Sequence, residues 1–165
     1  MHIYTKEQTM LDWNKIKEKS SQMLGDARQK LRQYTPESFS KEKKFVNSLV
    51  ISMALMTMAD KKASTEEVVA SIDLIKDIDE INDLEMTTDA IALYEHHIEE
   101  LSGVVGSPTK WVLTEAKLIS ELSKMKAYPE YPPMIEALVN HIANADGHLD
   151  ETEIEMQKKI LAAIS

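Results

Sequence analysis

The sequence predicts a single all-α domain, because apolar residues recur every three to four positions along its long segments and no segment alternates as a strand does. Aromatic residues make up only 5% of the 165 residues, whereas Met occurs ten times. This balance favours an adaptable helical core over a β-sandwich. The length fits one domain with its own hydrophobic core.

Start and stop signals place about seven helices along the chain. The first is expected over residues 8–34, as one amphipathic helix that Pro36 ends. Ser40 is the expected cap of the second helix, which covers about residues 41–58.

The third, fourth and fifth helices have recognisable boundaries. Ser64 begins the third, and Glu67, three residues further on, completes a capping box. An Asp- and Asn-rich link follows the third helix. The fourth ends near Gly103, and Ser107-Pro108 supplies a cap and a first-turn proline for the fifth.

The last two helices follow a proline-rich connector, residues 128–133, which is expected to be extended. The sixth helix covers about residues 133–145. The seventh begins after Asp150, and Glu153 lies at the position that closes a second capping box.

The turn before the third helix is similar to the turn before the seventh. Residues 54–67 align with residues 140–153, so that Asp60 falls on Asp146 and Glu67 on Glu153. Each copy lies between two apolar helical runs. A helix–acidic turn–helix unit that occurs twice predicts two units packed together, because each amphipathic hairpin needs a partner for its apolar face.

The second copy resembles the repeated signature of the tellurite-resistance TerB family, through residues 145–153, which read Ala-Asp-Gly-His-Leu-Asp-Glu-Thr-Glu. In the first copy Lys61 replaces the glycine, and Ser64 stands where the second copy has an acid. The resemblance covers roughly residues 40–165. It implies an all-helical fold, metal binding through these acids, and membrane-linked partners in chemical-stress resistance.

The charge is unevenly distributed. Residues 1–44 carry ten Lys and Arg against six Asp and Glu, whereas residues 45–165 carry nine against 22. The acidic body argues against nucleic acid as the main partner. The basic N-terminal part could contact anionic lipid or could be a solvated helix. We therefore expect an amphipathic helix, residues 1–35, appended to a TerB-like helical domain, residues 36–165.

The composition also limits the cellular compartments in which the protein is expected. There is no Cys, which excludes disulfides and thiolate zinc sites. No charged-then-apolar leader begins the sequence, and no apolar run is long enough to span a bilayer. The sequence therefore predicts a cytoplasmic protein that could sit at the inner face of a membrane; it does not indicate the oligomeric state.

Five acidic residues of the two turns are the candidate metal ligands: Asp60, Glu67, Asp146, Asp150 and Glu153. Carboxylates, together with the free carbonyls at a helix C-terminus, suit a hard cation, so Ca²⁺ or Mg²⁺ is the favoured ion. The alternative is that the acids only cap helices. Capping accounts for the residues of the two capping boxes but not for Asp60 and Asp146. These two are expected to lie at the C-terminal ends of helices, where the helix dipole disfavours negative charge.

A true calcium EF-hand loop is not expected. If Gly147 takes the sixth loop position, Ile142 falls on the first, where an oxygen ligand is needed. The first copy lacks the glycine as well. The remaining cation hypothesis is a weaker site, shared between the two turns.

No recognised catalytic pattern occurs in the chain. It lacks Glu-x-x-His, His-Glu-x-x-His, a phosphate-binding glycine loop and Gly-x-Ser-x-Gly. His97 and Glu100 could share a helix face, which makes half a site, and the role of His96 and His97 stays open. We therefore expect a non-enzymatic protein with no cofactor other than a divalent cation.

Two functions are favoured at this stage, and an enzyme built on His97 and Glu100 is a third, weaker hypothesis. The first is a TerB-like module that binds a divalent cation or a basic protein partner through its acidic turns, within a stress-resistance assembly. The second is an adaptor whose apolar groove, for which Met53, Met56 and Met58 are candidates, binds a partner helix while the acids serve as caps.

Overall fold

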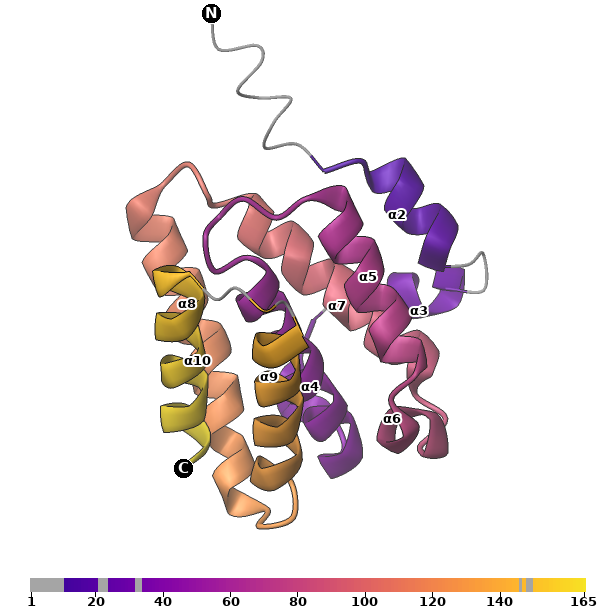
Figure 1. The fold of residues 1–165 in the computed structure, drawn as a ribbon. Coiled ribbons are helices and arrows are strands. Elements are labelled where there is room, and N and C mark those ends of the chain that lie inside the picture. The colour runs from indigo at the N-terminus through magenta and orange to yellow at the C-terminus, as the bar shows by residue number, and fades with distance from the viewer. Residues whose placement is uncertain (1–10, 21–23, 32–33, 146, 148–149) are drawn as a thin grey trace, which may run out of the picture.

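The computed structural model describes residues 11–20, 24–31, 34–145, 147 and 150–165. Every regular element in this part of the chain is helical (Figure 1), which confirms the predicted all-α class. The elements are α2 (Trp13–Ser20), α3 (Gly25–Lys30), the 3₁₀ turn η2 (Pro36–Ser38), α4 (Lys41–Thr57), α5 (Thr65–Lys76), α6 (Asp79–Asp83), α7 (Thr87–Ser102), α8 (Pro108–Ser123), the 3₁₀ turn η3 (Lys124–Ala127), α9 (Pro132–Ala145) and α10 (Glu151–Ile164).

Helix α4 forms the centre of the molecule, and all of its residues from Phe45 to Met56 are buried. A helix enclosed on every side needs apolar residues around its whole circumference, unlike a surface helix with one apolar stripe. Among its polar residues, the Ser52 hydroxyl donates to the Ser48 carbonyl at 2.9 Å, and the Asn47 amide bonds to Tyr34 and His97.

The other long helices surround α4. It contacts α5 and α7 as well as α8, α9 and α10. In Figure 1, α8 and α10 lie to its left, α9 passes in front of it, and α5 and α7 lie to its upper right. None of the described helices has both the length and the apolar character needed to cross a membrane.

The predicted helix caps are confirmed, and the first of the two predicted capping boxes is formed. Ser64 and Glu67 form the complete capping box, with the Ser64 hydroxyl accepting from the Glu67 amide at 3.1 Å and Glu67 accepting from the Ser64 amide at 3.2 Å. The side chains of three further residues accept from the amide three positions on, as predicted: Ser40, Ser107 and Asp150. These helix starts are therefore encoded locally.

The prediction of one helix over residues 8–34 is wrong in the described residues. Helix α2 ends at Ser20 and α3 begins at Gly25. Leu24, just before α3, is 3₁₀ and not α-helical, and Gly25 after it weakens a helix because glycine favours other backbone conformations. The apolar spacing is continuous across the break, so periodicity alone did not reveal it.

Both N-terminal helices pack on the body of the protein. Helix α2 lies on α5 and α3 lies on α7, and Ile16 and Leu24 are buried in the common core. The Asp12 amide also donates to the Thr65 hydroxyl at 3.0 Å. The boundary near residue 35 stays a prediction, and this burial adds the expectation that removal of residues 1–35 would lower stability.

The two repeats lie together, because α4 contacts both helices of the second unit, α9 and α10. Their turns also share a backbone conformation. Lys61 has φ of 61° and Gly147, which aligns with it, has φ of 65°. The two repeats are not equally enclosed: α4 is central, whereas α9 buries only Ile135, Val139 and Ala143.

Gly147→Ala is expected to lower the free energy of unfolding by about 1 kcal/mol, because a Cβ is disfavoured at positive φ. The cost would be purely conformational, since an added Cβ would meet no atom within 4 Å. Lys61→Gly should change stability by less than about 0.5 kcal/mol: relief of the same strain is offset by a more flexible unfolded chain. Urea denaturation of both variants checks this, and a larger loss for Lys61→Gly would contradict it.

Candidate functional site

A groove runs between α5 and α9 and has α4 as its floor. It consists of two cavities, of about 340 and 550 Å³, that share Leu74 of α5 and His141 of α9. Because both cavities contain these two residues, we treat them as one feature, the α5–α9 groove. It is open to solvent along its length, and no described Lys or Arg lines it.

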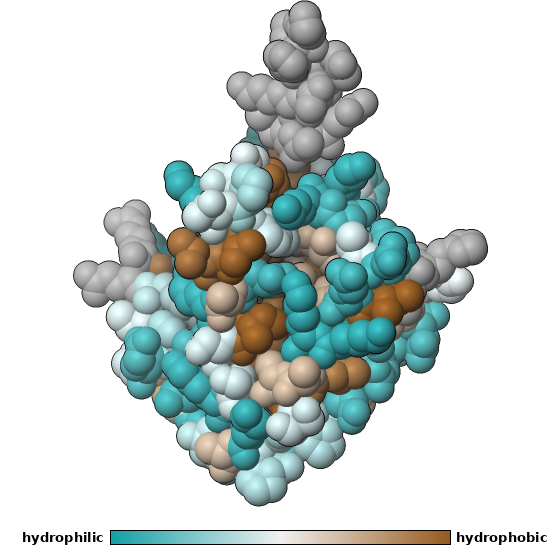
Figure 2. Space-filling view, turned by 90° about the vertical axis from the view of Figure 1, so that its left-hand side faces the viewer, coloured by the Kyte–Doolittle hydropathy of each residue, from teal (hydrophilic) through white to brown (hydrophobic). Residues whose placement is uncertain are grey.

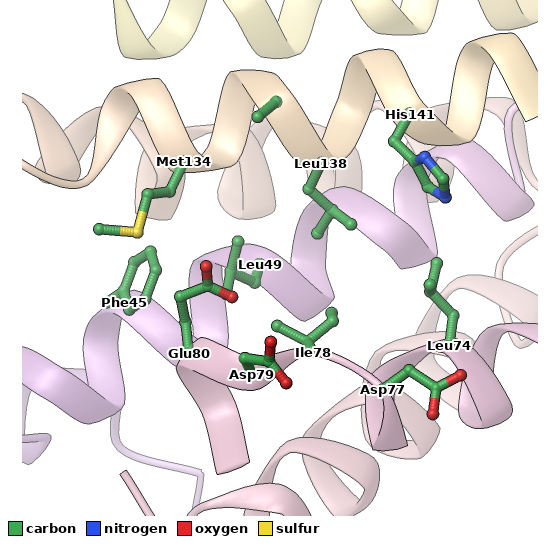
Figure 3. Close-up of a pocket in the computed structure, with 11 residues that line it drawn as sticks. Phe45, Leu49, Leu74, Asp77, Ile78, Asp79, Glu80, Met134, Leu138 and His141 are labelled. Atoms are coloured by element: carbon green, nitrogen blue, oxygen red, sulfur yellow. The ribbon is translucent and has the colours of Figure 1, made fainter. Parts of the chain in front are cut away.

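The smaller cavity forms the apolar end of the groove (Figure 3). Phe45 and Leu49 of α4 lie at its base, and Met134 and Leu138 project from α9 on one side. The base is rigid, because the Phe45 ring stacks on Tyr131 with centroids 4.2 Å apart. Leu138 and Met134 are half-buried, so they present apolar surface that the chain itself leaves partly uncovered.

The opposite edge of this end is acidic. Asp77, just after α5, and Asp79 and Glu80, in the first turn of α6, line the cavity, and all three are exposed. The sequence identified these residues only as part of an Asp- and Asn-rich link. Its acidity was the available signal, but only the packing of α6 shows that these carboxylates border an apolar cavity.

The larger cavity forms the other end, and it brings together three of the predicted ligands. Asp60 follows α4, Glu67 lies in the first turn of α5 and Glu153 in the first turn of α10, and all three line this cavity. The acids of the two repeats therefore converge, because the two units pack with their turns on the same side. His141 lies between the two ends.

The other two predicted ligands are not brought to this cavity. Asp150 is exposed and caps α10, with its Oδ1 accepting from the Glu153 amide at 2.9 Å and from the Thr152 hydroxyl at 2.6 Å. These hydrogen bonds, chiefly the one from Thr152, lower the pKa of Asp150. Asp146 lies outside the described residues.

The two acids of the first repeat already have local structural partners. The Asp60 carboxylate accepts from the Lys62 amide at 2.9 Å, which closes the turn after α4. Glu67 accepts from the Ser64 amide in the capping box. Asp60, which capping did not explain at the level of sequence, therefore stabilises its own turn in the way Asp and Asn commonly do.

The groove acids do not form a compact ligand cluster. Among the described residues, only His96, His97 and Glu100 place potential ligand atoms within 4.8 Å of one another. A hard cation held by protein oxygens needs several of them at 2.3–2.6 Å, or at shorter distances for Mg²⁺. The carboxylates of the groove are spread along its edges, which suits an extended cationic ligand better than one ion.

Another side of the molecule offers a contrast. Figure 2 looks onto the side where α8 and α10 lie, and its hydrophobic atoms form separate patches among hydrophilic ones. The large apolar side chains that are exposed among the described residues belong to these two helices: Val112, Leu113 and Ile154. Isolated exposed residues of this kind are normal on a protein surface.

Two of the methionines suggested as groove residues belong to the core instead. Met53 and Met58 are 1% and 3% exposed, and neither lines the α5–α9 groove. Met56 does line the larger cavity. Helical periodicity could not separate these positions, because α4 is buried around its whole circumference.

Comparisons of the chain with protein-family models, curated proteins and solved structures found no match.

Proposed function

We propose that the protein is a non-catalytic docking module whose α5–α9 groove binds a basic amphipathic helix of a partner protein. The observation that carries the proposal is the composition of the groove: an apolar base bordered by six carboxylates, with no described Lys or Arg in its lining. This combines the two hypotheses from the sequence, because the apolar groove and the acidic turns belong to one surface.

An amphipathic helix satisfies both parts of this surface. Its apolar face would cover Leu138, Met134 and the α4 side chains, removing partly exposed apolar area from water. Its Lys and Arg would lie along the edges, near Asp77 and Glu80 at one end and Glu153 at the other. The overall charge of −9 would also attract a basic partner over longer distances.

The resemblance to the TerB family suggests the setting. It would place this docking in a chemical-stress resistance assembly at the inner face of a membrane, with recruitment through partner proteins. This setting rests on the residues of the second acidic turn alone, whereas the docking proposal rests on the groove.

A divalent cation in the larger cavity is the second candidate function, and one observation favours it. Asp60, Glu67 and Glu153 come from three different helices or turns and still line the same cavity. Ca²⁺ or Mg²⁺ would draw these carboxylates together with water completing its shell. It would raise the melting temperature, because binding to the native state alone stabilises it.

The docking proposal is tested with labelled helical peptides of about five turns, in which Leu lines one face. One peptide carries Lys on its polar face, a second carries Glu, and a third contains the residues of the first in an order that is not amphipathic. Fluorescence anisotropy is expected to show binding of the Lys peptide only, weakened by salt. Equal binding of all three, or no binding up to about 1 mM, would overturn the proposal.

Matched variants locate the site. Leu138→Lys places a charge in the apolar end and is expected to weaken binding at least tenfold, which is about 1.4 kcal/mol. Leu113→Lys introduces the same change at an exposed position of α8 and should have no such effect. If both reduce binding equally, the peptide binds elsewhere.

The charged edge is tested in the same way. The double variant Asp77→Asn/Glu80→Gln is expected to weaken binding of the Lys peptide about fivefold, since exposed ion pairs contribute modestly. Glu136→Gln/Glu155→Gln removes the same charge from exposed positions outside the groove. A melting temperature that rises with Ca²⁺ or Mg²⁺ in wild type, but not in Glu153→Gln, would instead favour the cation function.

A further inference from the structure

A second cluster, outside the groove, lies on α7 where it faces α4 and α8. It contains His96, His97 and Glu100, each of which offers a ligand atom within 4.8 Å of the others. Positions 97 and 100 are three apart and positions 96 and 100 are four apart, so all three side chains lie along one side of the helix. His97 is completely buried, His96 is half-buried and Glu100 is about half-buried.

The hydrogen bonds of His97 determine which of its nitrogens carries a proton. The Asn47 amide nitrogen donates to the Tyr34 hydroxyl at 2.8 Å, which turns the Asn47 amide oxygen toward His97. That oxygen lies 2.8 Å from Nε2 of His97. Because an amide oxygen only accepts, Nε2 must donate, and in the neutral ring Nδ1 then carries a lone pair.

This leaves two acceptors facing each other in the interior. Nδ1 of His97 and Oε1 of Glu100 are both buried without a hydrogen-bond partner, and they lie 3.8 Å apart. That distance is too long for a hydrogen bond. Unsatisfied buried acceptors are rare in native proteins and indicate a missing partner.

We propose that His96, His97 and Glu100 form a binding site for a borderline divalent metal ion, of which Zn²⁺ is the best match. Two imidazoles and one carboxylate are a common ligand set for zinc, which prefers nitrogen ligands more than Ca²⁺ and Mg²⁺ do. Bonds of about 2.0–2.2 Å in a tetrahedral site place neighbouring ligand atoms roughly 3.3–3.6 Å apart. The 3.8 Å between His97 and Glu100 therefore needs only a small contraction.

The surroundings fit such a site. The Asn47 oxygen holds the His97 ring by its second nitrogen, the arrangement that commonly orients metal-binding histidines. A metal ion would enter from the side of His96. This residue lines a solvent-open cleft of about 360 Å³ together with Glu95 and Glu99. The fourth metal position would belong to water or to a ligand from outside the cluster.

Lys117 of α8 is the group that opposes metal binding. Its ammonium pairs with Oε2 of Glu100, and it is half exposed. Lys117 therefore competes with a metal ion for the charge of the Glu100 carboxylate.

The experiment is a titration of metal-stripped protein with Zn²⁺ against a chromogenic chelator. One Zn²⁺ per chain is expected, and Co²⁺ in its place should give the visible absorption of a four- or five-coordinate ion. His96→Ala should weaken Zn²⁺ binding at least tenfold and abolish the Co²⁺ spectrum. His141→Ala, which removes an exposed His from α9, should leave both unchanged.

Lys117→Met gives a test in the opposite direction, which a folding defect cannot mimic. Removal of the competing ammonium should strengthen Zn²⁺ binding severalfold, with the same Co²⁺ spectrum. The alternative is that the Asn47 amide is turned, so that His97 donates to Glu100 through Nδ1. In that case Zn²⁺ would bind no tighter than about 100 μM, and His96→Ala and Lys117→Met would have no effect. Either result would overturn the proposal.

Discussion

Leu55→Ala is expected to lower the free energy of unfolding by about 3–4 kcal/mol. Leu55 has no exposed surface, and it lies near the C-terminal end of α4, which the other long helices surround. Truncation removes three carbon atoms from a site that neighbours on several sides hold open. The loss therefore includes a cavity in addition to the lost burial.

The chain contains a matched control for this change. Leu113 on α8 is 66% exposed, so Leu113→Ala should change stability by less than about 0.5 kcal/mol. Urea denaturation followed by circular dichroism measures both variants, and the slope with denaturant should stay at the wild-type value. Similar losses at the two positions would contradict the central place of α4.

Arg28→Met is expected to destabilise the protein by about 3 kcal/mol. Arg28 of α3 binds Glu95 of α7 through two hydrogen bonds, from Nε to Oε1 at 2.9 Å and from Nη2 to Oε2 at 3.1 Å. The Glu95 side chain is only 7% exposed. Loss of the guanidinium would leave a buried carboxylate without the charge that bonds both of its oxygens.

The double variant Arg28→Met/Glu95→Met tests this explanation. It removes both charges, so it should recover most of the lost stability, because a buried ion pair contributes little more than apolar side chains of similar size. Thermal melts of the two single variants and the double variant form a complete cycle. If the double variant is as unstable as Arg28→Met, the loss comes from the packing of α3 and not from the charge.

The Arg28–Glu95 ion pair also attaches the N-terminal part of the chain to the rest of the protein. The sequence separates residues 1–35 by charge and by Pro36, and both features are real properties of the chain. Arg28 and Ile16 nevertheless connect this part to α7 and to the core. Sequence patterns indicate which helix face is apolar, but they do not say what covers it.

The docking and zinc proposals can be separated by experiment. The α5–α9 groove and the His96–His97–Glu100 cluster share no residue. Leu138→Lys should weaken peptide binding and leave Zn²⁺ binding intact, and His96→Ala should weaken Zn²⁺ binding and leave peptide binding intact. A variant that removes both would show that the two surfaces act together or that the fold has been lost.

The sequence by itself determined the helical class, most helix boundaries and the two related acidic turns. These features depend on local interactions: apolar spacing along a helix, and a cap side chain that reaches an amide three residues away. Ser40, Ser64, Ser107 and Asp150 all act as predicted. The left-handed backbone shared by Lys61 and Gly147 agrees with the repeat for the same local reason.

Only the tertiary structure decided where the functional candidates meet. Glu153 joins Asp60 and Glu67 in one cavity because α5 and α10 both pack on α4, and their separation in sequence is one that no periodicity reports. Likewise, the sequence indicates only that His97 lies on the apolar face of a helix. Its Nδ1 lacks a partner because its Nε2 bonds to Asn47, which is fifty residues away in the sequence. Contacts between distant segments depend on how whole helices pack, and one sequence contains that information only through the fold.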